Sequence, residues 1–151
     1  MKFRRFKYES VSSTNNVAIR LIKIDKEKSG FVFAKKQTQG KGTMGKKWIS
    51  EMGNLFGSFF FPLNAKLPCF SEFAIINPVI ISKVIARYCK KKEISFKKPN
   101  DIFVNEKKIC GILQEVVTFN TVNYLIIGIG INIVSNPKIN HGFKATNIFF
   151  E

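Results

Sequence analysis

The sequence predicts a single α/β domain of the α+β kind, in which a mixed, largely antiparallel sheet carries helices mainly on one side. Three observations lead to this prediction. The chain has 151 residues, enough for one domain with one core. Hydrophobic residues make up 45% of it and include 16 Phe, which excludes a disordered chain. Two segments show helical spacing of apolar residues, whereas several short apolar runs are separated by turn residues.

The first 62 residues predict a strand, a helix and two further strands. Residues 1–11 form a short strand or arm. Ser12 to Asn15 then supply short polar side chains of the kind that cap helices. Apolar residues follow at helical spacing until residues 25–30 end the helix. Two apolar runs predict buried strands on either side of a glycine-rich loop: Phe31 to Ala34, and Leu55 to Phe61 before Pro62.

The second half predicts one more helix and four strands. Apolar residues recur at helical spacing from Phe73 to Cys89, where Pro78 either starts or kinks the helix, and Lys90 to Lys92 close it. Four apolar runs separated by turn residues then predict strands at 94–97, 102–104, 109–117 and 124–131. The chain is loop-like after Val134.

The loop from Gln37 to Trp48 alternates three glycines with three lysines. Glycine lets a ligand approach the backbone, and free N–H groups with nearby lysines suit a phosphate. The spacing of Gly40, Gly42 and Gly45 also fits the dinucleotide fingerprint, but no helical pattern and no suitably placed acidic residue follow. Lys47 stands where a P-loop needs Ser or Thr. We therefore expect the loop to join two strands, as a phosphate loop of another type or as an ordinary surface loop.

Charge and rare residues narrow the classes of function. The net charge is +15, which favours anionic partners such as nucleotides, nucleic acid or an acidic protein. Three cysteines without a C-x-x-C pair indicate reduced thiols, and a single histidine argues against metal sites built on His and against Ser/His or Cys/His catalysis. The N-terminus lacks a signal peptide's apolar region, and charges interrupt the most apolar stretch, so neither secretion nor a membrane span is expected.

A hairpin is predicted where residues 97–102 are followed by residues 107–115. Asp101 lies near its base, and the returning strand brings Lys108 back beside it. A carboxylate close to a lysine suits a Mg²⁺-bound polyphosphate, although an ordinary hairpin with solvated lysines explains this segment equally well by itself.

Four motifs together resemble the catalytic domain of biotin–protein ligases. They are Ser13-Thr14-Asn15, the loop from Gln37 to Trp48, the hairpin Lys97 to Ile102 with Lys108 to Leu113, and Gly128 to Asn132. Their order and spacing carry the resemblance, which runs through most of the chain. It implies the class II synthetase-like fold of biotin and lipoate ligases. It also implies an enzyme that joins biotin to ATP, giving biotinyl-5′-AMP, and then transfers biotin to one lysine of a biotin carboxyl carrier protein.

The resemblance also implies a role for each matching residue. Lys108 matches the catalytic lysine, which bridges the biotin carboxylate and the α-phosphate of ATP. The positions that match biotin-binding residues are Ser13, Thr14, Asn15, Gln37, Gly40, Lys41, Gly42, Gly111 and Leu113. The positions expected to bind ATP or the adenylate are Lys41, Thr43, Trp48, Lys97, Asn100, Asp101 and Asn132. Mg²⁺ is expected to arrive with ATP, near Asp101 and Asn132.

The sequence departs from the family pattern at several points. Thr43 stands where the family usually has an arginine that helps hold the adenylate, and Lys98 replaces a common Trp. Residues 1–151 are expected to form a catalytic domain without the family's C-terminal part. No DNA-binding domain is expected before Met1, so neither a repressor role nor a DNA partner is expected.

Biotin, ATP and the carrier protein are the expected partners, in the cytoplasm, with no membrane partner and with a homodimer as an open possibility. Two alternatives to biotin ligation also stay open. The first is a lipoate or octanoate ligase of related fold. The second, from a different class, is a basic nucleic-acid-binding module, which would explain the net charge but not why lysines gather beside Gly40 to Gly45 and Asp101.

Overall fold

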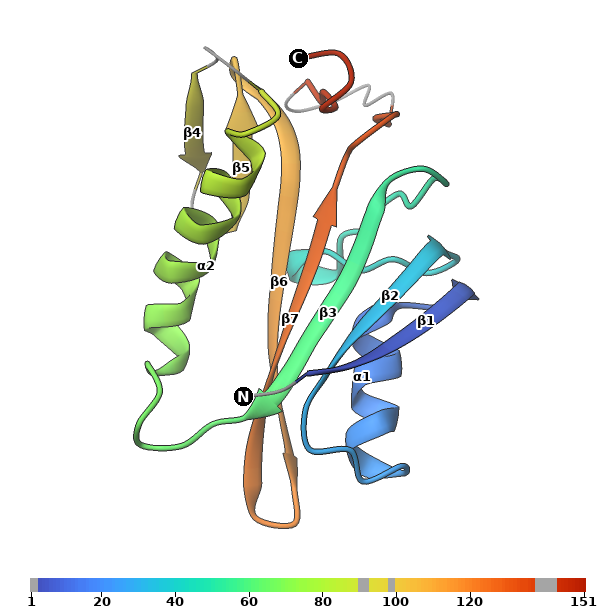
Figure 1. Ribbon diagram of the computed structural model, residues 1–151, viewed down its shortest axis with the longest axis vertical. Coiled ribbons are helices and arrows are strands. Elements are labelled where there is room, and N and C mark those ends of the chain that lie inside the picture. The colour runs from blue at the N-terminus through green and yellow to red at the C-terminus, as the bar shows by residue number, and fades with distance from the viewer. Residues whose placement is uncertain (1–2, 90–92, 98–99, 138–143) are drawn as a thin grey trace.

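The computed structural model describes residues 3–89, 93–97, 100–137 and 144–151. These form a seven-stranded sheet with two helices (Figure 1). The strands are β1 (Arg4–Val11), β2 (Gly30–Gln37), β3 (Leu55–Pro62), β4 (Ile94–Lys97), β5 (Asp101–Val104), β6 (Lys107–Phe119) and β7 (Val122–Ile131). The helices are α1 (Thr14–Lys23) and α2 (Phe70–Ile85), and a short 3-10 turn, η1, spans Thr43–Gly45.

The strand order across the sheet is β1-β2-β3-β7-β6-β5-β4. Only β1 and β2 run parallel, because α1 connects them as a crossover. All other neighbours are antiparallel, so the predicted mixed, largely antiparallel sheet is confirmed. The glycine-rich loop joins β2 to β3, which excludes a dinucleotide fingerprint because no α-helix follows the glycines.

The prediction that the helices lie mainly on one side of the sheet is wrong. Phe60 and Ile126 pack in one hydrophobic cluster with α1, whereas their neighbours Phe61 and Leu125 pack in a second cluster with α2. Successive side chains of a strand point to opposite faces. The two helices therefore cover opposite faces, which we call the α1 face and the α2 face. The central strands are apolar on both faces, and such strands need cover on both sides.

The predicted helix boundaries also need correction. Helix α2 begins at Phe70 and ends at Ile85, so Pro78 lies inside it and does not start it. The expected basic run, Lys90 to Lys92, lies outside the described residues, as do Lys98 and the single histidine, His141. The two hairpin turns are confirmed. Their residues have positive φ angles, at Asn105 and Glu106 and at Asn120 and Thr121.

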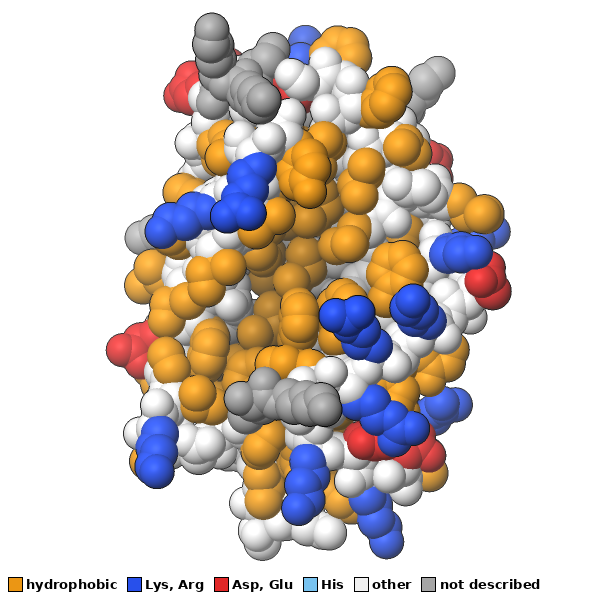
Figure 2. All heavy atoms as spheres, in the orientation of Figure 1, with side chains coloured by type: hydrophobic (Ala, Val, Ile, Leu, Met, Phe, Trp, Pro, Cys, Tyr) orange, Lys and Arg blue, Asp and Glu red, His pale blue; other side chains and the backbone are white. Residues whose placement is uncertain are grey.

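The α2 face is strongly apolar and only partly covered. Figure 2 shows hydrophobic side chains gathered over a hollow between α2 and the neighbouring strands. Phe31 and Phe59 are half-buried there, with ring centroids 4.4 Å apart. Helix α2 also exposes apolar side chains, with Ile75 at 70% and Ile80 at 56%. Within the described part of the chain, no helix combines the length and apolarity needed to cross a membrane.

Candidate functional site

A cavity of about 520 Å³ opens on the α1 face, and we call it the central cavity. The N-terminus of α1, the β2–β3 loop and the central strands β6 and β7 surround it. Its lining includes Ser13, Thr14, Asn15, Gln37, Lys41, Gly42, Thr43, Trp48, Asn100, Asp101, Lys108, Gly111, Leu113 and Asn132. Segments far apart in the sequence thus meet at one place.

Glycines on β6 and β7 make room for this cavity. A Cβ atom at Gly111 would lie 2.6 Å from the Trp48 ring, and one at Gly130 would lie 2.5 Å from it. A Cβ atom at Gly128 would lie 2.4 Å from Oδ1 of Asn15. Each distance is too short for a real contact. The indole therefore rests on bare backbone, and any larger residue at these positions would push Trp48 or Asn15 into the cavity.

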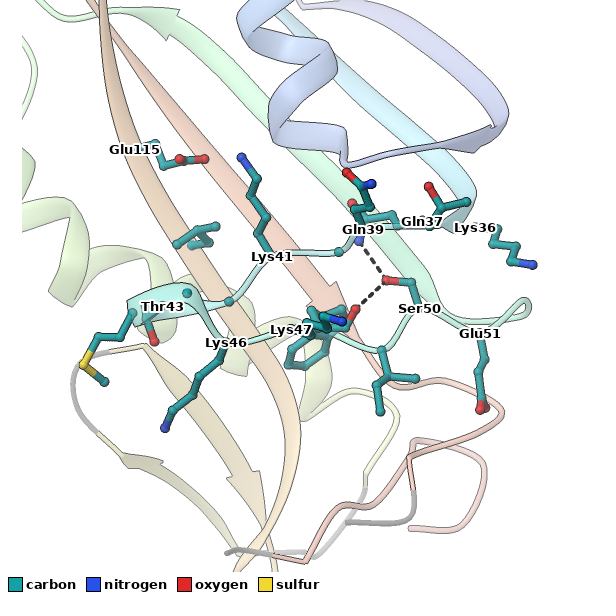
Figure 3. A pocket seen from close by; sticks show the side chains of 18 of the residues that line it. Lys36, Gln37, Gln39, Lys41, Thr43, Lys46, Lys47, Ser50, Glu51 and Glu115 are labelled. Atoms are coloured by element: carbon teal, nitrogen blue, oxygen red, sulfur yellow. Dashed lines mark hydrogen bonds between the residues drawn. The ribbon is translucent and has the colours of Figure 1, made fainter. Parts of the chain in front are cut away.

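The first turn of α1 is held by a side chain from β2 rather than by its own cap. Ser13 is the N-cap residue, but its side chain makes no cap hydrogen bond, contrary to the expected capping chemistry. The backbone N–H of Thr14 instead donates to Oε1 of Gln37 over 2.8 Å. Gln37 then donates from Nε2 to Ser50 (2.9 Å), whose hydroxyl donates to the Trp48 carbonyl (3.1 Å), as Figure 3 shows. Gln37 thus fixes the helix terminus and the loop together.

A buried polar chain continues from Thr14 into the sheet. The Ser58 hydroxyl, fully buried on β3, contacts both Oγ1 of Thr14 (2.8 Å) and Oδ1 of Asn15. Asn15 donates from Nδ2 to the carboxylate of Glu115 over 2.6 Å. Buried polar groups are costly unless they are hydrogen-bonded, and here each has a partner. The chain therefore fixes the orientation of Thr14 and Asn15 at one end of the cavity.

A lysine and a carboxylate occupy the other end. Nζ of Lys108 lies 2.7 Å from Oδ1 of Asp101, and the two side chains are 18% and 13% exposed. Lys108 also lies over the Trp48 ring, 5.3 Å from its centroid. The predicted proximity of Lys108 and Asp101 is confirmed. A β-bulge between Ile102 and Phe103 shifts the register of β5 against β6 beside this pair.

The neighbouring thiol is not a nucleophile. Burial raises the pKa of Cys110 far above its ordinary value, with the Asp101 carboxylate adding to the effect. A thiol attacks as the thiolate, so Cys110 is inert at neutral pH. Among the described residues, no three of His, Cys, Asp and Glu cluster as metal ligands would.

Apart from Oδ1 of Asp101, which has its ion pair with Lys108, two buried polar atoms beside the cavity have no hydrogen-bond partner within the described residues. They are Oδ1 of Asn132, whose side chain is 2% exposed, and Nε1 of Trp48. Asn132 is held in place because its Nδ2 donates to the Thr146 carbonyl (3.0 Å). An unsatisfied buried polar atom calls for an explanation, and a missing ligand supplies one. Both residues line the cavity.

The β2–β3 loop contributes its residues unequally. Lys41 donates to Oδ1 of Asn16 over 2.6 Å, which ties the loop to α1. A Cβ atom at Gly40 would lie 2.3 Å from the Trp48 carbonyl oxygen, whereas one at Gly42 would lie no closer than 3.3 Å to its nearest neighbour. The fold therefore requires glycine at Gly40 much more than at Gly42. The same loop lines a second, more open cavity with Gly40, Thr43 and Lys46 (Figure 3).

The structure brings together most of the residues that the sequence singles out. Asn100 lines the cavity and donates to the Ile112 carbonyl over 2.8 Å. Lys97 differs, because it is exposed on β4 and is not among the described residues that line the central cavity. Sequence reasoning missed three contributors, Ser50, Ser58 and Glu115, and it named Gly128 and Gly130 only as part of a motif, without a role. A serine inside the apolar run of β3 was the available signal for Ser58, since a polar residue there needs a buried partner.

The chemical character of the cavity lining thus changes from one end to the other. One end offers neutral hydrogen-bonding groups, Leu113 adds an apolar wall, and Lys108 with Asp101 makes a charged end. Asp101 pairs with Gly111 and Asn15 contacts the Leu113 carbonyl, and these two β6 residues are two positions apart, or roughly 7 Å along the strand. This suits a ligand with a polar head, an apolar body and an anionic tail.

A cavity of this kind, beside a loop whose glycines and lysines suit an anion, defines a protein that can bind a small acid together with a nucleotide. Residues 8–132 match the model of the Biotin/lipoate A/B protein ligase family, and the chain belongs to this family.

Named relatives and solved structures agree with this assignment. The chain is 32% identical over 133 residues to the bifunctional ligase/repressor BirA of Bacillus subtilis, covering 87% of this chain and 41% of that protein. It is 31% identical to the human biotin–protein ligase over 116 residues, covering 72% of this chain and 16% of that protein.

Two solved structures share the fold. Biotin protein ligase from Leishmania major in complex with biotin superposes with a TM-score of 0.78 at 32% identity, over 99% of this chain and 64% of that one. Biotin protein ligase from Aquifex aeolicus, in complex with biotin and ATP, gives a TM-score of 0.74 at 29% identity, over 97% of this chain and 60% of that one. The chain thus spans less than two thirds of the length of each relative.

Proposed function

We propose that this chain activates biotin with ATP and transfers it to a lysine of a biotin carboxyl carrier protein. One observation carries the proposal: the cavity joins a neutral hydrogen-bonding end, at Thr14 and Gln37, to a charged end at Lys108. Biotin has a polar ureido ring, an apolar chain and a carboxylate, in that order. The related Leishmania ligase has been crystallised with biotin and with biotinyl-5-AMP, which supports the same ligands here.

The proposed first step needs no protein nucleophile. An oxygen of the biotin carboxylate attacks the α-phosphorus of ATP, the bond between the α- and β-phosphates breaks, and pyrophosphate leaves with the electron pair. Lys108 lies at the end of the cavity where this negative charge gathers, and a placed cation stabilises it. Asp101 holds the ammonium group until an anion arrives. The rest of the acceleration comes from alignment of the reactants.

The proposed second step is acyl transfer. The neutral amine of a carrier lysine attacks the carboxyl carbon of biotinyl-5′-AMP, an amide forms, and AMP leaves with the electron pair while the amine loses its proton. The β2–β3 loop would cover the adenylate between the two steps, since Lys41 and Gly42 line the central cavity and Gly40 lines the second cavity beside it.

Magnesium fits the donor set of the charged end. Mg²⁺ prefers oxygen ligands and usually combines one or two protein oxygens with waters and substrate phosphates. Asp101 supplies a carboxylate, and Asn132 supplies a buried amide oxygen without a partner among the described residues. These two residues would hold the ion, which would neutralise the phosphates of bound ATP.

A lipoate ligase is the nearest alternative. The neutral polar end of the cavity favours biotin, because a dithiolane ring has no N–H group or carbonyl for Thr14 and Gln37 to bind. The nucleic-acid alternative explains the net charge of +15 but not the enclosed cavity. A cytoplasmic location, a carrier protein as the acceptor and a homodimer remain predictions.

Calorimetry with biotin, and then with biotin plus MgATP, tests the proposal. We expect saturable biotin binding that changes little between low and moderate salt, and mass spectrometry of the second mixture should detect biotinyl-5′-AMP. Nucleic-acid binding would instead weaken steeply with salt. Absence of biotin binding, or equal binding of lipoate, would contradict the proposed substrate. Binding without adenylate would restrict the chain to holding biotin.

A further inference from the structure

Two segments outside the helices and strands form one wall of the central cavity at its charged end. The first follows β7 and contributes Pro137 to the lining. The second contributes Ala145, which forms an isolated parallel bridge with Lys108. Both segments lie at the end of the sheet where β7 ends (Figure 1). Because neither belongs to a regular element, other groups must satisfy their backbone N–H groups and carbonyls.

Asn54 supplies the acceptor for the first segment. Its Oδ1 receives three consecutive backbone N–H groups, those of Ile133 (2.8 Å), Val134 (3.1 Å) and Ser135 (3.3 Å). A backbone N–H only donates, so the amide oxygen must face these groups. Nδ2 of Asn54 accordingly points to the Ser135 hydroxyl, over 3.1 Å. The side chain is buried, at 6% exposed, and its orientation is determined by the backbone that it holds.

The backbone contacts of neighbouring residues do not replace Asn54. The N–H of Asn132 donates to the Ile109 carbonyl over 2.9 Å, which holds the chain as far as the end of β7. The carbonyl of Ile133 accepts from the N–H of Phe149 over 2.9 Å, but this contact satisfies none of the three N–H groups. Asn54 therefore fixes the path that the chain takes after Asn132.

The segment that Asn54 holds reaches both parts of the wall. Pro137 is two residues beyond the last of the three hydrogen bonds and lines the cavity directly. Asn136 donates from Nδ2 to the Ala145 carbonyl over 3.3 Å, which ties the second segment to the first. A displacement of the first segment would therefore move Pro137 and weaken the hold on Ala145, next to Lys108.

We propose that Asn54 is a positioning residue for nucleotide binding: by holding the three N–H groups it sets the wall at the charged end of the cavity. Asn54 itself is not among the described residues that line the central cavity. The proposal rests on the proposed function, in which ATP occupies the charged end. The biotin end, at Thr14 and Gln37, is built on α1 and β2. A change at Asn54 should therefore affect the two ligands unequally.

Calorimetry with α,β-methylene-ATP and Mg²⁺, and separately with biotin, tests the proposal by comparing the natural chain with Asn54→Ala. The analogue carries the three phosphates but cannot be cleaved between the α- and β-phosphates, so binding is measured without chemistry. Asn54→Ala should weaken nucleotide binding about tenfold, as the loss of an outer-shell support does at a metal site. Its biotin affinity should change little.

Two further variants separate the acceptor from the rest of the side chain. Asn54→Asp keeps an oxygen for the three N–H groups and should restore nucleotide affinity toward that of the natural chain. Ser135→Ala removes the partner of Nδ2 but none of the three N–H groups, and should bind the nucleotide as the natural chain does. If thermal unfolding shows that Asn54→Ala fails to fold, Asn136→Ala takes its place. That variant breaks the tie to Ala145 from a half-buried position and should weaken nucleotide binding by a few-fold.

Unchanged nucleotide affinity in Asn54→Ala, or an equal loss for both ligands, would overturn the proposal. So would a loss in Asn54→Asp as large as that in Asn54→Ala, because the acceptor would then not matter. A natural chain that binds no nucleotide would overturn it as well. Nucleotide binding without biotin binding would instead contradict the proposed function alone.

Discussion

The same strands form a ligand cavity on one face of the sheet and an apolar core on the other. On the α1 face, glycines and small polar residues leave room for a cavity. The buried polar groups beside it form a hydrogen-bonded chain around Asn15 and Ser58. On the α2 face, the intervening residues are large and apolar, and Leu125 and Ile127 join the cluster with Phe61. Strand β7 thus carries stability on one side and space for a ligand on the other.

Because of this contrast, we expect substitutions on the two faces to affect different quantities, ligand binding on one and the free energy of unfolding on the other. Gly130 and its neighbour Ile131 are adjacent on β7 but face opposite sides of the sheet. Changes at the cavity on the α1 face, away from the cluster that contains Phe60 and Ile126, should alter ligand binding or chemistry with little effect on folding. Changes on the α2 face should alter the free energy of unfolding with little effect on the ligand.

The largest expected effect is on chemistry at the charged end. Lys108→Ala should slow adenylate formation by roughly 10²–10³-fold, the usual cost of removing one placed electrostatic group. Biotin affinity should change much less, because the charge acts where negative charge develops. Pyrophosphate release and biotin calorimetry measure the two quantities. Lys83→Ala, at an exposed lysine of α2 on the opposite face of the sheet, is the matched control.

Loss of Lys108 also leaves the Asp101 carboxylate without its ion-pair partner, and this can lower stability. The double variant Lys108→Ala with Asp101→Asn removes that charge. It should recover thermal stability without recovering adenylate formation. Recovery of both, or equal losses in affinity and rate for Lys108→Ala, would remove Lys108 from the catalytic role.

The second prediction compares neighbours on β7. Gly130→Ala places a methyl group where the Trp48 ring lies, since a Cβ atom would sit 2.5 Å from it. The indole must move into the cavity, and we expect biotin affinity to fall about tenfold or more. Ile131→Val, on the α2 face and not among the described residues that line the central cavity, should leave the affinity unchanged. If both variants weaken binding alike, the two faces are not independent.

The sequence predicted the strands, the hairpin turns and the meeting of the four motifs, because alternation, turn residues and motif order are local signals. It failed on the placement of α2, since strands such as β3 are apolar on both faces and give no period that assigns a helix to one side. It also missed Ser58 and Glu115. Their role follows only from contacts across 43 and 100 positions of the chain.

The third prediction tests the α2 face by itself. Ile127 is 6% exposed and pairs with Phe59 across the sheet. Ile127→Val deletes one methylene group, and the free energy of unfolding should fall by about 1 kcal/mol. Urea unfolding measures this change, and biotin calorimetry on the same sample should give an unchanged dissociation constant. A clear loss of affinity would mean that packing on the α2 face supports the cavity on the other side.

The smallest expected effect concerns Thr43, in the short turn of the β2–β3 loop, which lines both cavities. Threonine cannot give the two parallel, charge-assisted hydrogen bonds that arginine gives to a phosphate. Lysines near it supply charge, but Lys41 is already tied to Asn16, which leaves Lys46 and Lys47 as the cavity-lining lysines of the loop best placed to compensate. A lysine is a point charge without arginine's fork, so retention of the adenylate should be somewhat loose.

Thr43→Arg should therefore slow the dissociation of biotinyl-5′-AMP by a few-fold, which corresponds to under about 1.4 kcal/mol. Thr43→Lys is the matched control, because it adds the charge without the fork. A slower release from the arginine variant alone would assign retention to the geometry of the side chain, whereas equal slowing in both would assign it to charge. Identical rates in all three chains would show that position 43 does not govern retention, and that Lys46 and Lys47 already hold the phosphate.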